Sequence, residues 1–243
     1  MAGFLTENDE GWDFKILVLE DEWVVRTPRN AEAAESLAKE TRLLPVLAPA
    51  LPVAIPQFEH VSRNPDFVVY RLIHGEPLRD EDPAGVRAFL DALHSFELGA
   101  IDLPRPEWRD IYRGHAEDWR RLVLPLLDAG ERKAAEELLE EVETLTGFEP
   151  SLVHCDLGPS HLLCRDGRLA GVIDWADAKR GDPAVDYAWL LNVPFPDWDV
   201  DAELRRRAQI YHRLGPWFEV EYGVRTKQPA WVESGLEGVR SRL

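Results

Sequence analysis

A segment of short apolar runs that end in acidic residues, residues 151–174, constrains the fold of this 243-residue chain most strongly. SLVHC predicts a short strand, and HLLCRDGRLAGVIDW predicts a hairpin that turns at Asp166 and Gly167. Asp156 follows the strand, and Asp174 follows the hairpin 18 residues later. A loop and a turn arranged in this way can supply a base and oxygen ligands for a metal ion to one site.

Strands also dominate the first 72 residues. Residues 14–19 and 23–26 are rich in β-branched and aromatic side chains, and the acidic turn EDE between them predicts a hairpin. The next segment, AEAAESLAKETRLL, has apolar residues at helical spacing, and Pro45 is expected to end that helix. FEHV and FVVYRLI predict two further strands, so residues 1–72 are expected to form a small β-rich unit with one helix.

The rest of the chain is expected to be mainly helical, which predicts an α+β fold. DPAGVRAFLDALHSF has Asp82 at the N-cap and Pro83 at the first helical position. ERKAAEELLEEVETLTG repeats the helical spacing, and Gly147 suits its C-cap. Further helices are expected from Pro183 onward, with Asp182 as an N-cap.

Composition excludes several classes of protein. The formal net charge is −17, so a nucleic acid partner, which needs a basic surface, is not expected. The acidity favours cationic ligands, or it serves solubility alone. Two cysteines, Cys155 and Cys164, are too few for a disulfide framework or a four-cysteine zinc site. The first residues lack a signal-peptide pattern, and the most apolar stretch, residues 43–56, is short for a membrane span and contains four prolines. We therefore expect a cytoplasmic protein without a membrane partner.

Three kinds of chemistry fit LVHCDLGPSHLL, residues 152–163. Zinc binding through His154, Asp156 and His161 is weakly supported, because HxD is a common pattern and the cysteines lack a CxxC spacing. Nucleophilic catalysis by Ser160 is weaker still, because the GxSxG context is missing. Phosphoryl transfer needs a carboxylate near the attacking hydroxyl, oxygen ligands for magnesium and a cation on the phosphates. The loop and the acidic turn match this third set of needs.

HCDLGPSH followed by GVIDWADAKRGDPAVDYAWLL resembles the aminoglycoside and macrolide phosphotransferase family, whose members are related to protein kinases. GWDFKILVLEDEWVVRTPR, KETRLLPVLAPALPVAIP and FVVYRLIHGEPL are similar, in order, to upstream parts of the family pattern, and the match covers about residues 7–192. The resemblance implies a two-lobed protein-kinase-like fold. A nucleotide-binding lobe, residues 1–72, would end in the hinge, and a helical lobe, residues 73–243, would carry the catalytic loop, the metal turn and the acceptor site.

The resemblance also implies roles for the aspartates and histidines of these motifs. Asp156 matches the catalytic aspartate, and Asp174 matches the metal-turn aspartate. His161 stands where most of the family has asparagine, as in many macrolide phosphotransferases, which implies either a magnesium ligand or a phosphate-facing or structural histidine. His154 and Asp186 are expected to brace the catalytic loop.

Nucleotide binding is assigned by the same resemblance. Arg26 stands at the position of the kinase lysine on the third strand, Glu40 is its expected partner, and Arg29 is the rival for the phosphates. Gly11 is the only glycine of the nucleotide loop. ATP and GTP both remain open as donors, and a hinge is expected at Tyr70, Arg71 and Leu72.

For the acceptor, carboxylates would hold an ammonium group and tryptophan faces would suit a sugar or a cation. Helix caps and core tryptophans would give the same pattern. The candidates are Asp177, Asp197, Asp199, Asp201, Glu203, Trp198, Trp217 and Glu219.

The expected function is nucleotide-dependent, magnesium-supported O-phosphorylation of a hydroxyl on an amine-bearing, antibiotic-like small molecule by a monomer. The alternatives are a housekeeping kinase for choline, a sugar amine or an amino acid, and a nucleotide-binding module with little catalysis.

Overall fold

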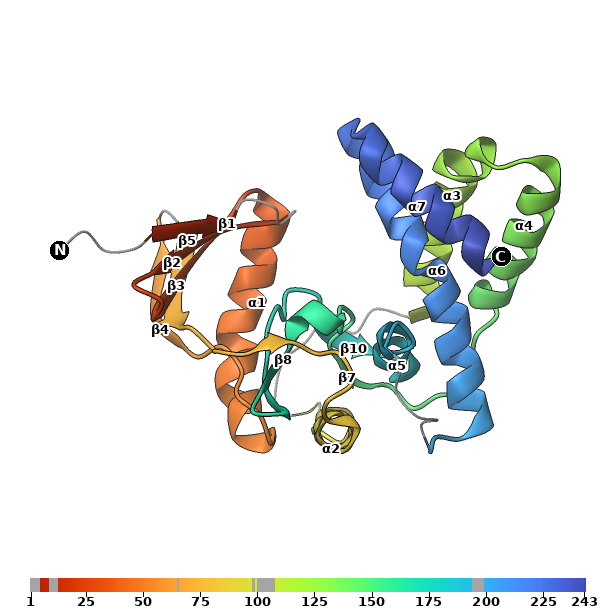
Figure 1. Cartoon of the computed structure of the whole chain (residues 1–243). Helices are drawn as coiled ribbons and strands as arrows, with labels where there is room; N and C mark the ends of the chain where they lie inside the picture. The colour runs from red at the N-terminus through yellow and green to blue at the C-terminus, as the bar shows by residue number, and fades with distance from the viewer. Residues whose placement is uncertain (1–4, 9–12, 65, 98, 100–107, 194–198) are drawn as a thin grey trace. The chain divides into compact units, whose positions relative to one another are not determined.

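The computed structural model describes residues 5–8, 13–64, 66–97, 99, 108–193 and 199–243 (Figure 1). The chain forms two compact units. The first unit comprises Met1–Leu103, Ser151–Lys179 and Val193–Pro196, and the second comprises Pro104–Pro150, Arg180–Asn192 and Asp197–Leu243. The first unit contains the predicted nucleotide-binding lobe, residues 1–72, together with Asp156 and Asp174, which were predicted to lie in the lobe of residues 73–243. The lobe boundary stays a prediction.

A five-stranded antiparallel sheet begins the first unit. Its strands, in spatial order, are β1 (Leu5–Asn8), β2 (Phe14–Leu19), β3 (Trp23–Pro28), β5 (Asp66–Arg71) and β4 (Phe58–Arg63). Helix α1 (Ala31–Leu47) runs along one face of this sheet (Figure 1). The predicted order of two strands, a helix and two strands is confirmed for β2, β3, α1, β4 and β5, whereas the edge strand β1 was not predicted. Phe14, Val24, Leu37 and Val68 form the core between sheet and helix.

Helix α1 begins at Asn30, whose side chain accepts a hydrogen bond from the Ala33 N–H at 2.8 Å. The prediction that Pro45 ends the helix is wrong, because the helix continues to Leu47. Pro45 lies in the last turn, so its missing N–H removes only one hydrogen bond near the end of the helix. Burial of Leu44 and Leu47, which are fully inaccessible to solvent, offsets that loss.

The remainder of the first unit supports the predicted site. An antiparallel sheet is formed by β6 (Glu76–Pro77), β8 (Leu162–Arg165) and β9 (Arg168–Val172). The β8–β9 hairpin turns at Asp166 and Gly167, both with positive φ, as predicted. Helix α2 (Pro83–His94) is capped by Asp82, also as predicted. The other elements are the strand β7 (Ser151–Val153) and the 3-10 turns η1 (Ala48–Ala50) and η4 (Pro159–His161).

The second unit is helical in the part that the structure describes. Its elements are α3 (Trp108–Leu122), η3 (Leu124–Leu126), α4 (Ala129–Glu143), α5 (Ala184–Leu190), α6 (Ala202–Thr226) and α7 (Pro229–Arg242), and β10 (Lys179–Gly181) precedes α5. The C-cap of helix α4 is Thr144 and not the predicted Gly147, because the Thr144 N–H closes the last turn by donating to the carbonyls of Glu141 and Val142. Among the described helices, none is both long and apolar enough to cross a membrane.

Candidate active site

The catalytic loop is held by a buried histidine. His154 is fully buried, and its Nε2 lies 3.0 Å from the Ile173 carbonyl oxygen, while the Asp156 N–H donates to its Nδ1 at 3.3 Å. A carbonyl only accepts, so Nε2 carries the proton and the ring is the neutral tautomer. The ring also packs edge-on against Trp175 with centroids 4.7 Å apart. These contacts join the loop to the strand that precedes the metal turn.

Two residues of the site have left-handed backbone conformations. Cys155 has φ 70° and Asp174 has φ 61°. An L-residue in this conformation is strained, whereas glycine adopts it readily. Both strained positions lie in the two loops that carry the site aspartates, since Cys155 precedes Asp156 directly.

Three side chains could share one cation. Asp156, His161 and Asp174 each offer a ligand atom, and these atoms lie within 4.8 Å of one another. His161 Nδ1 lies 2.7 Å from the Asp156 carbonyl oxygen, so Nδ1 is the donor and the lone pair of the neutral ring is on Nε2. Nε2 lies 4.0 Å from Asp174 Oδ2. Two carboxylates and an imidazole nitrogen at these separations fit a divalent cation.

A buried arginine connects helix α1 to the metal turn. Arg26 Nη1 donates to both Glu40 carboxylate oxygens at 3.0 and 2.7 Å, and Arg26 Nη2 donates to Asp174 Oδ1 at 2.9 Å. The guanidinium also lies 3.6 Å from the centre of the Phe14 ring. The predicted pair of Arg26 with Glu40 is therefore present, and Arg26 reaches Asp174 of the metal turn. The choice between Arg26 and Arg29 for the nucleotide phosphates stays a prediction.

The two site aspartates have different proton affinities. Burial raises the pKa of Asp156 to about 6, and the nearby Asp174 adds to this rise while His161 opposes it. Burial also disfavours the charged form of Asp174, but Arg26 and His161 hold the pKa of that carboxyl below its usual value. Asp156 is thus the better proton acceptor near neutral pH, and Asp174 stays anionic as a metal ligand requires.

The two partners of the buried pair respond differently to burial, since Arg26, in spite of its desolvation, has its pKa raised by the attraction to Glu40 and Asp174. Burial raises the pKa of Glu40 to about 7 even though Arg26 lowers it. The desolvation of this fully buried carboxylate therefore outweighs its attraction to Arg26. A pair with this energy balance is best explained by its effect on position, since it fixes the guanidinium beside Asp174.

One contact of the metal turn was not predicted. The Lys39 ammonium donates to the carbonyl oxygens of Ala176 and Ala178 at 2.5 and 2.7 Å. The sequence signal was the position of Lys39 next to Glu40 in a helix, but helical periodicity alone does not show which segment faces a lysine. Trp175, fully buried with its indole N–H on the Val172 carbonyl at 3.1 Å, is a second unpredicted support of this turn.

The expected hinge lies at the end of β5. Tyr70 is part of the strand, and burial raises the pKa of its hydroxyl to about 12. The Leu72 N–H donates to the Glu22 carbonyl at 2.8 Å, and the hinge role of Leu72 stays a prediction. The Arg71 guanidinium stacks 3.6 Å from the centre of the Trp23 ring. Contacts of Tyr70 and Arg71 with a nucleotide stay predictions, and Gly11 lies outside the described residues.

The acceptor candidates differ in burial and in the contacts that they make. Trp217 is fully buried, with its ring centre 5.6 Å from that of Trp119, so the prediction that its face binds an acceptor is wrong. Asp201 caps α6 by accepting from the Leu204 N–H at 2.9 Å, as the alternative explanation by helix caps proposed. Trp198 and Asp197 lie outside the described residues.

The remaining candidates occupy varied surroundings. Asp177 is exposed, with its carboxylate 3.8 Å from the Lys179 ammonium. Asp199 is exposed, and Glu203 lies 3.3 Å from Arg206. Glu219 is partly buried on α6, and Asp186 is fully buried in the first turn of α5. The bracing role of Asp186 and the acceptor roles of Asp177, Asp199 and Glu219 stay predictions.

Comparison with known proteins assigns the family. The model of the phosphotransferase enzyme family matches residues 5–222. This chain belongs to that family. The solved GDP and kanamycin complex of an aminoglycoside 2″-phosphotransferase aligns with a TM-score of 0.88 and 26% identity, over 98% of this chain and 92% of that one. The fold is thus the kinase-like phosphotransferase fold, and the chain is an enzyme that transfers phosphate from a nucleotide.

Two curated relatives are similar to this chain in sequence. The uncharacterized protein YcbJ of Bacillus subtilis is 26% identical over 92% of this chain and 80% of its own length. Viomycin phosphotransferase of Streptomyces vinaceus is 35% identical over 51% of this chain and 49% of its own length. The phosphotransferase therefore spans about half of the viomycin enzyme in that match.

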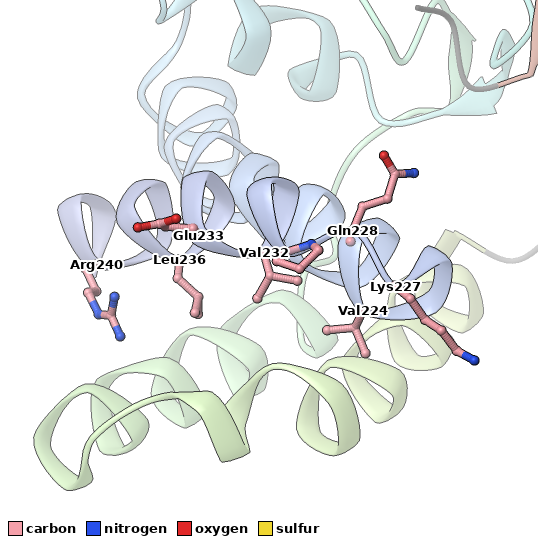
Figure 2. Close-up of a pocket in the computed structure, with 9 residues that line it drawn as sticks. Val224, Lys227, Gln228, Val232, Glu233, Leu236 and Arg240 are labelled. Carbon is pink, nitrogen blue, oxygen red and sulfur yellow. The ribbon is translucent and has the colours of Figure 1, made fainter.

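A groove of about 580 Å³ lies on the hairpin of α6 and α7 (Figure 2). Val224, Val232 and Leu236 give it an apolar lining, and Lys227 and Arg240 also line it. The residues that line this groove do not include Asp156, His161 or Asp174. Glu233 is the carboxylate that lines the groove, and no histidine lines it, so the groove lacks the cluster of two aspartates and a histidine that marks the site in the first unit.

Proposed function

We propose that this phosphotransferase moves the γ-phosphoryl group of a magnesium-bound purine nucleotide to a hydroxyl of an amine-bearing antibiotic or a similar cationic small molecule. The observation that carries the proposal is the convergence of Asp156, His161, Asp174 and Arg26 within the first unit. This set supplies a base, a cation site and a fixed positive charge, the three things that phosphoryl transfer needs.

Asp156 acts as the general base. Its carboxylate takes the proton of the acceptor hydroxyl while the hydroxyl oxygen forms a bond to the γ-phosphorus, and the bond from that phosphorus to the bridging oxygen breaks to release the nucleoside diphosphate. A pKa raised to about 6 makes Asp156 a stronger base than an ordinary aspartate, yet leaves it mostly ionised at neutral pH.

Asp174 and His161 would hold the magnesium ion, which would neutralise the charge that develops on the phosphate oxygens. Arg26 supplies fixed positive charge beside this site, and Glu40 fixes its direction. His154 keeps the backbone of the catalytic loop in place through its two hydrogen bonds.

Several observations support the class of acceptor. The net charge of −17 favours a cationic molecule. One aligned structure contains kanamycin, and one relative is named for viomycin. Many macrolide phosphotransferases have histidine at the position of His161, so macrolides also belong to the proposed acceptors. A monomer in the cytoplasm is part of the proposal.

A panel of phosphate-transfer assays tests the function. The purified protein is incubated with magnesium and either ATP or GTP, with kanamycin, viomycin, a macrolide or choline as the acceptor, and the mass of each acceptor is measured. We expect a gain of one phosphate on an antibiotic, which Asp156→Asn abolishes. Phosphorylation of choline alone would instead indicate a housekeeping kinase, and no transfer to any acceptor together with no nucleotide binding would refute the proposal.

A further inference from the structure

Helix α1 contacts the metal turn through two consecutive residues. Glu40 reaches Asp174 indirectly, through Arg26. Lys39, the residue before it, reaches the backbone of the same turn directly, on the carbonyl oxygens of Ala176 and Ala178. One contact therefore controls the carboxylate of Asp174, and the other controls the main chain that follows it.

The Lys39 ammonium replaces water for these two carbonyl groups. Burial lowers the pKa of Lys39, and Asp177 opposes this effect most strongly, with Glu40 and Cys155 also opposing it and Lys179 adding to it. Desolvation of an ammonium is unfavourable, so two short hydrogen bonds to carbonyl groups are the compensation that the site offers. Through these two hydrogen bonds, Lys39 contacts both ends of the stretch of residues 176–178.

The turn also has restraints of its own, which tie its backbone to Asp174 and Trp175. Asp174 has a left-handed backbone, and its carboxylate accepts from the Ala176 N–H. The Ala178 N–H donates to the Trp175 carbonyl at 3.1 Å. If the 176–178 stretch moves, the Ala176 N–H leaves the Asp174 carboxylate and the aspartate loses its orientation toward His161.

We propose that Lys39 is a positioning residue that locks the metal turn, so that Asp174 is oriented for the magnesium nucleotide before it binds. This inference rests on the proposed function, since it assigns the purpose of the lock to the metal site. Lys39 touches no reacting atom, and it acts only through the backbone of Ala176 and Ala178.

The test compares Lys39→Met, which keeps the length and apolar character of the stem, with Lys39→Arg, which can still donate to two carbonyl groups. Lys133→Met on α4 is the matched control, because the Lys133 side chain is 82% exposed and belongs to the second unit. Calorimetry measures magnesium-dependent nucleotide affinity, steady-state kinetics separates KM for the nucleotide from kcat, and hydrogen exchange follows the amides of residues 174–179.

Loss of an indirect support for a metal ligand weakens metal affinity by about 10–100-fold. We therefore expect Lys39→Met to weaken magnesium-dependent nucleotide affinity by about tenfold or more, to raise KM more than it lowers kcat, and to speed exchange only in the metal turn. Lys39→Arg should recover most of the affinity, and Lys133→Met should match the unmodified protein.

Magnesium-dependent affinity of Lys39→Met within about twofold of the unmodified protein would overturn the inference while leaving the proposed function intact. Faster exchange throughout the first unit, without recovery in Lys39→Arg, would show a general structural role and would also overturn it. Absence of nucleotide binding in the unmodified protein would refute the proposed function, and the inference with it.

Discussion

Glu40→Gln should make the ligand-free protein more stable at alkaline pH, although it removes one partner of a buried ion pair. Glu40 is fully buried, and its pKa rises from an ordinary value of 4.5 to about 7. A carboxyl group whose pKa is higher in the folded than in the unfolded chain favours folding while it is protonated. That contribution is complete below about pH 4.5 and is lost as the pH rises through about 7.

The size of the effect follows from the two pKa values. At about 1.4 kcal/mol per pKa unit, the difference corresponds to about 3 kcal/mol over the whole titration, and about 2–3 kcal/mol of it falls between about pH 5 and about pH 8.5. Glutamine resembles the protonated acid in shape and charge, so the variant should lack this loss. Arg26 keeps Asp174 as a charged partner in the variant, so its charge is not left unpaired.

The measurement is urea unfolding of both proteins at the two pH values, followed by tryptophan fluorescence, without magnesium or nucleotide because bound ligand would add its own stabilisation. Other titrating groups, including Asp156, are present in both proteins and cancel in the comparison. The free energy of unfolding of the variant, relative to the unmodified protein, should rise by about 2–3 kcal/mol between the two pH values. Parallel pH profiles would refute the reasoning, because they would mean that Glu40 titrates with the same pKa in the folded and unfolded chain. The same variant should bind magnesium nucleotide more weakly, so it should gain stability at alkaline pH and lose nucleotide affinity at the same time.

The other predictions concern four single residues. Asp156→Asn should lower turnover by about 10²–10⁴-fold with little change in nucleotide affinity, as steady-state kinetics and calorimetry can show. Asp174→Asn should weaken magnesium-dependent nucleotide binding itself, and an equal binding defect in both variants would contradict this division of roles. His161→Asn should keep phosphate transfer but lower the affinity for Mn²⁺ relative to Mg²⁺, because imidazole favours the transition metal; an unchanged ratio of the two dissociation constants would place the ring outside the metal site. Trp217→Ala should lower the free energy of unfolding by about 3–5 kcal/mol, which urea titration measures, since it leaves a cavity beside Trp119.

Local patterns in the sequence were enough to predict the hairpins, most of the helices and the central aspartates. The β8–β9 turn depends on the backbone preferences of Asp166 and Gly167, and the capping of α2 depends on Asp82. Such features involve residues that are neighbours in the chain, so their physical cause is visible in the sequence. Side chains of a strand point to alternate faces, and Arg26 therefore shares the core-facing side of β3 with Val24. This alternation favours Arg26 over Arg29 as the arginine of the site.

Where local preferences competed with burial, the sequence was a poor guide. Pro45 usually ends a helix, but the packing of Leu44 and Leu47 in α1 outweighs one missing hydrogen bond. Trp217 has the same composition signal as a ligand-binding tryptophan, and only its complete burial beside Trp119 shows that it belongs to the core.

Contacts between distant parts of the chain depend on the tertiary structure alone. Arg26 and Asp174 are 148 positions apart, and Lys39 and Ala176 are 137 positions apart. The family-like motifs predicted that Arg26 and Asp174 serve one site, but they contain no information about Lys39, whose bonds go to backbone carbonyl groups that every residue possesses. Side-chain identity therefore predicts the chemistry of the site, whereas the packing of α1 against the metal turn determines which backbone groups a lysine can reach.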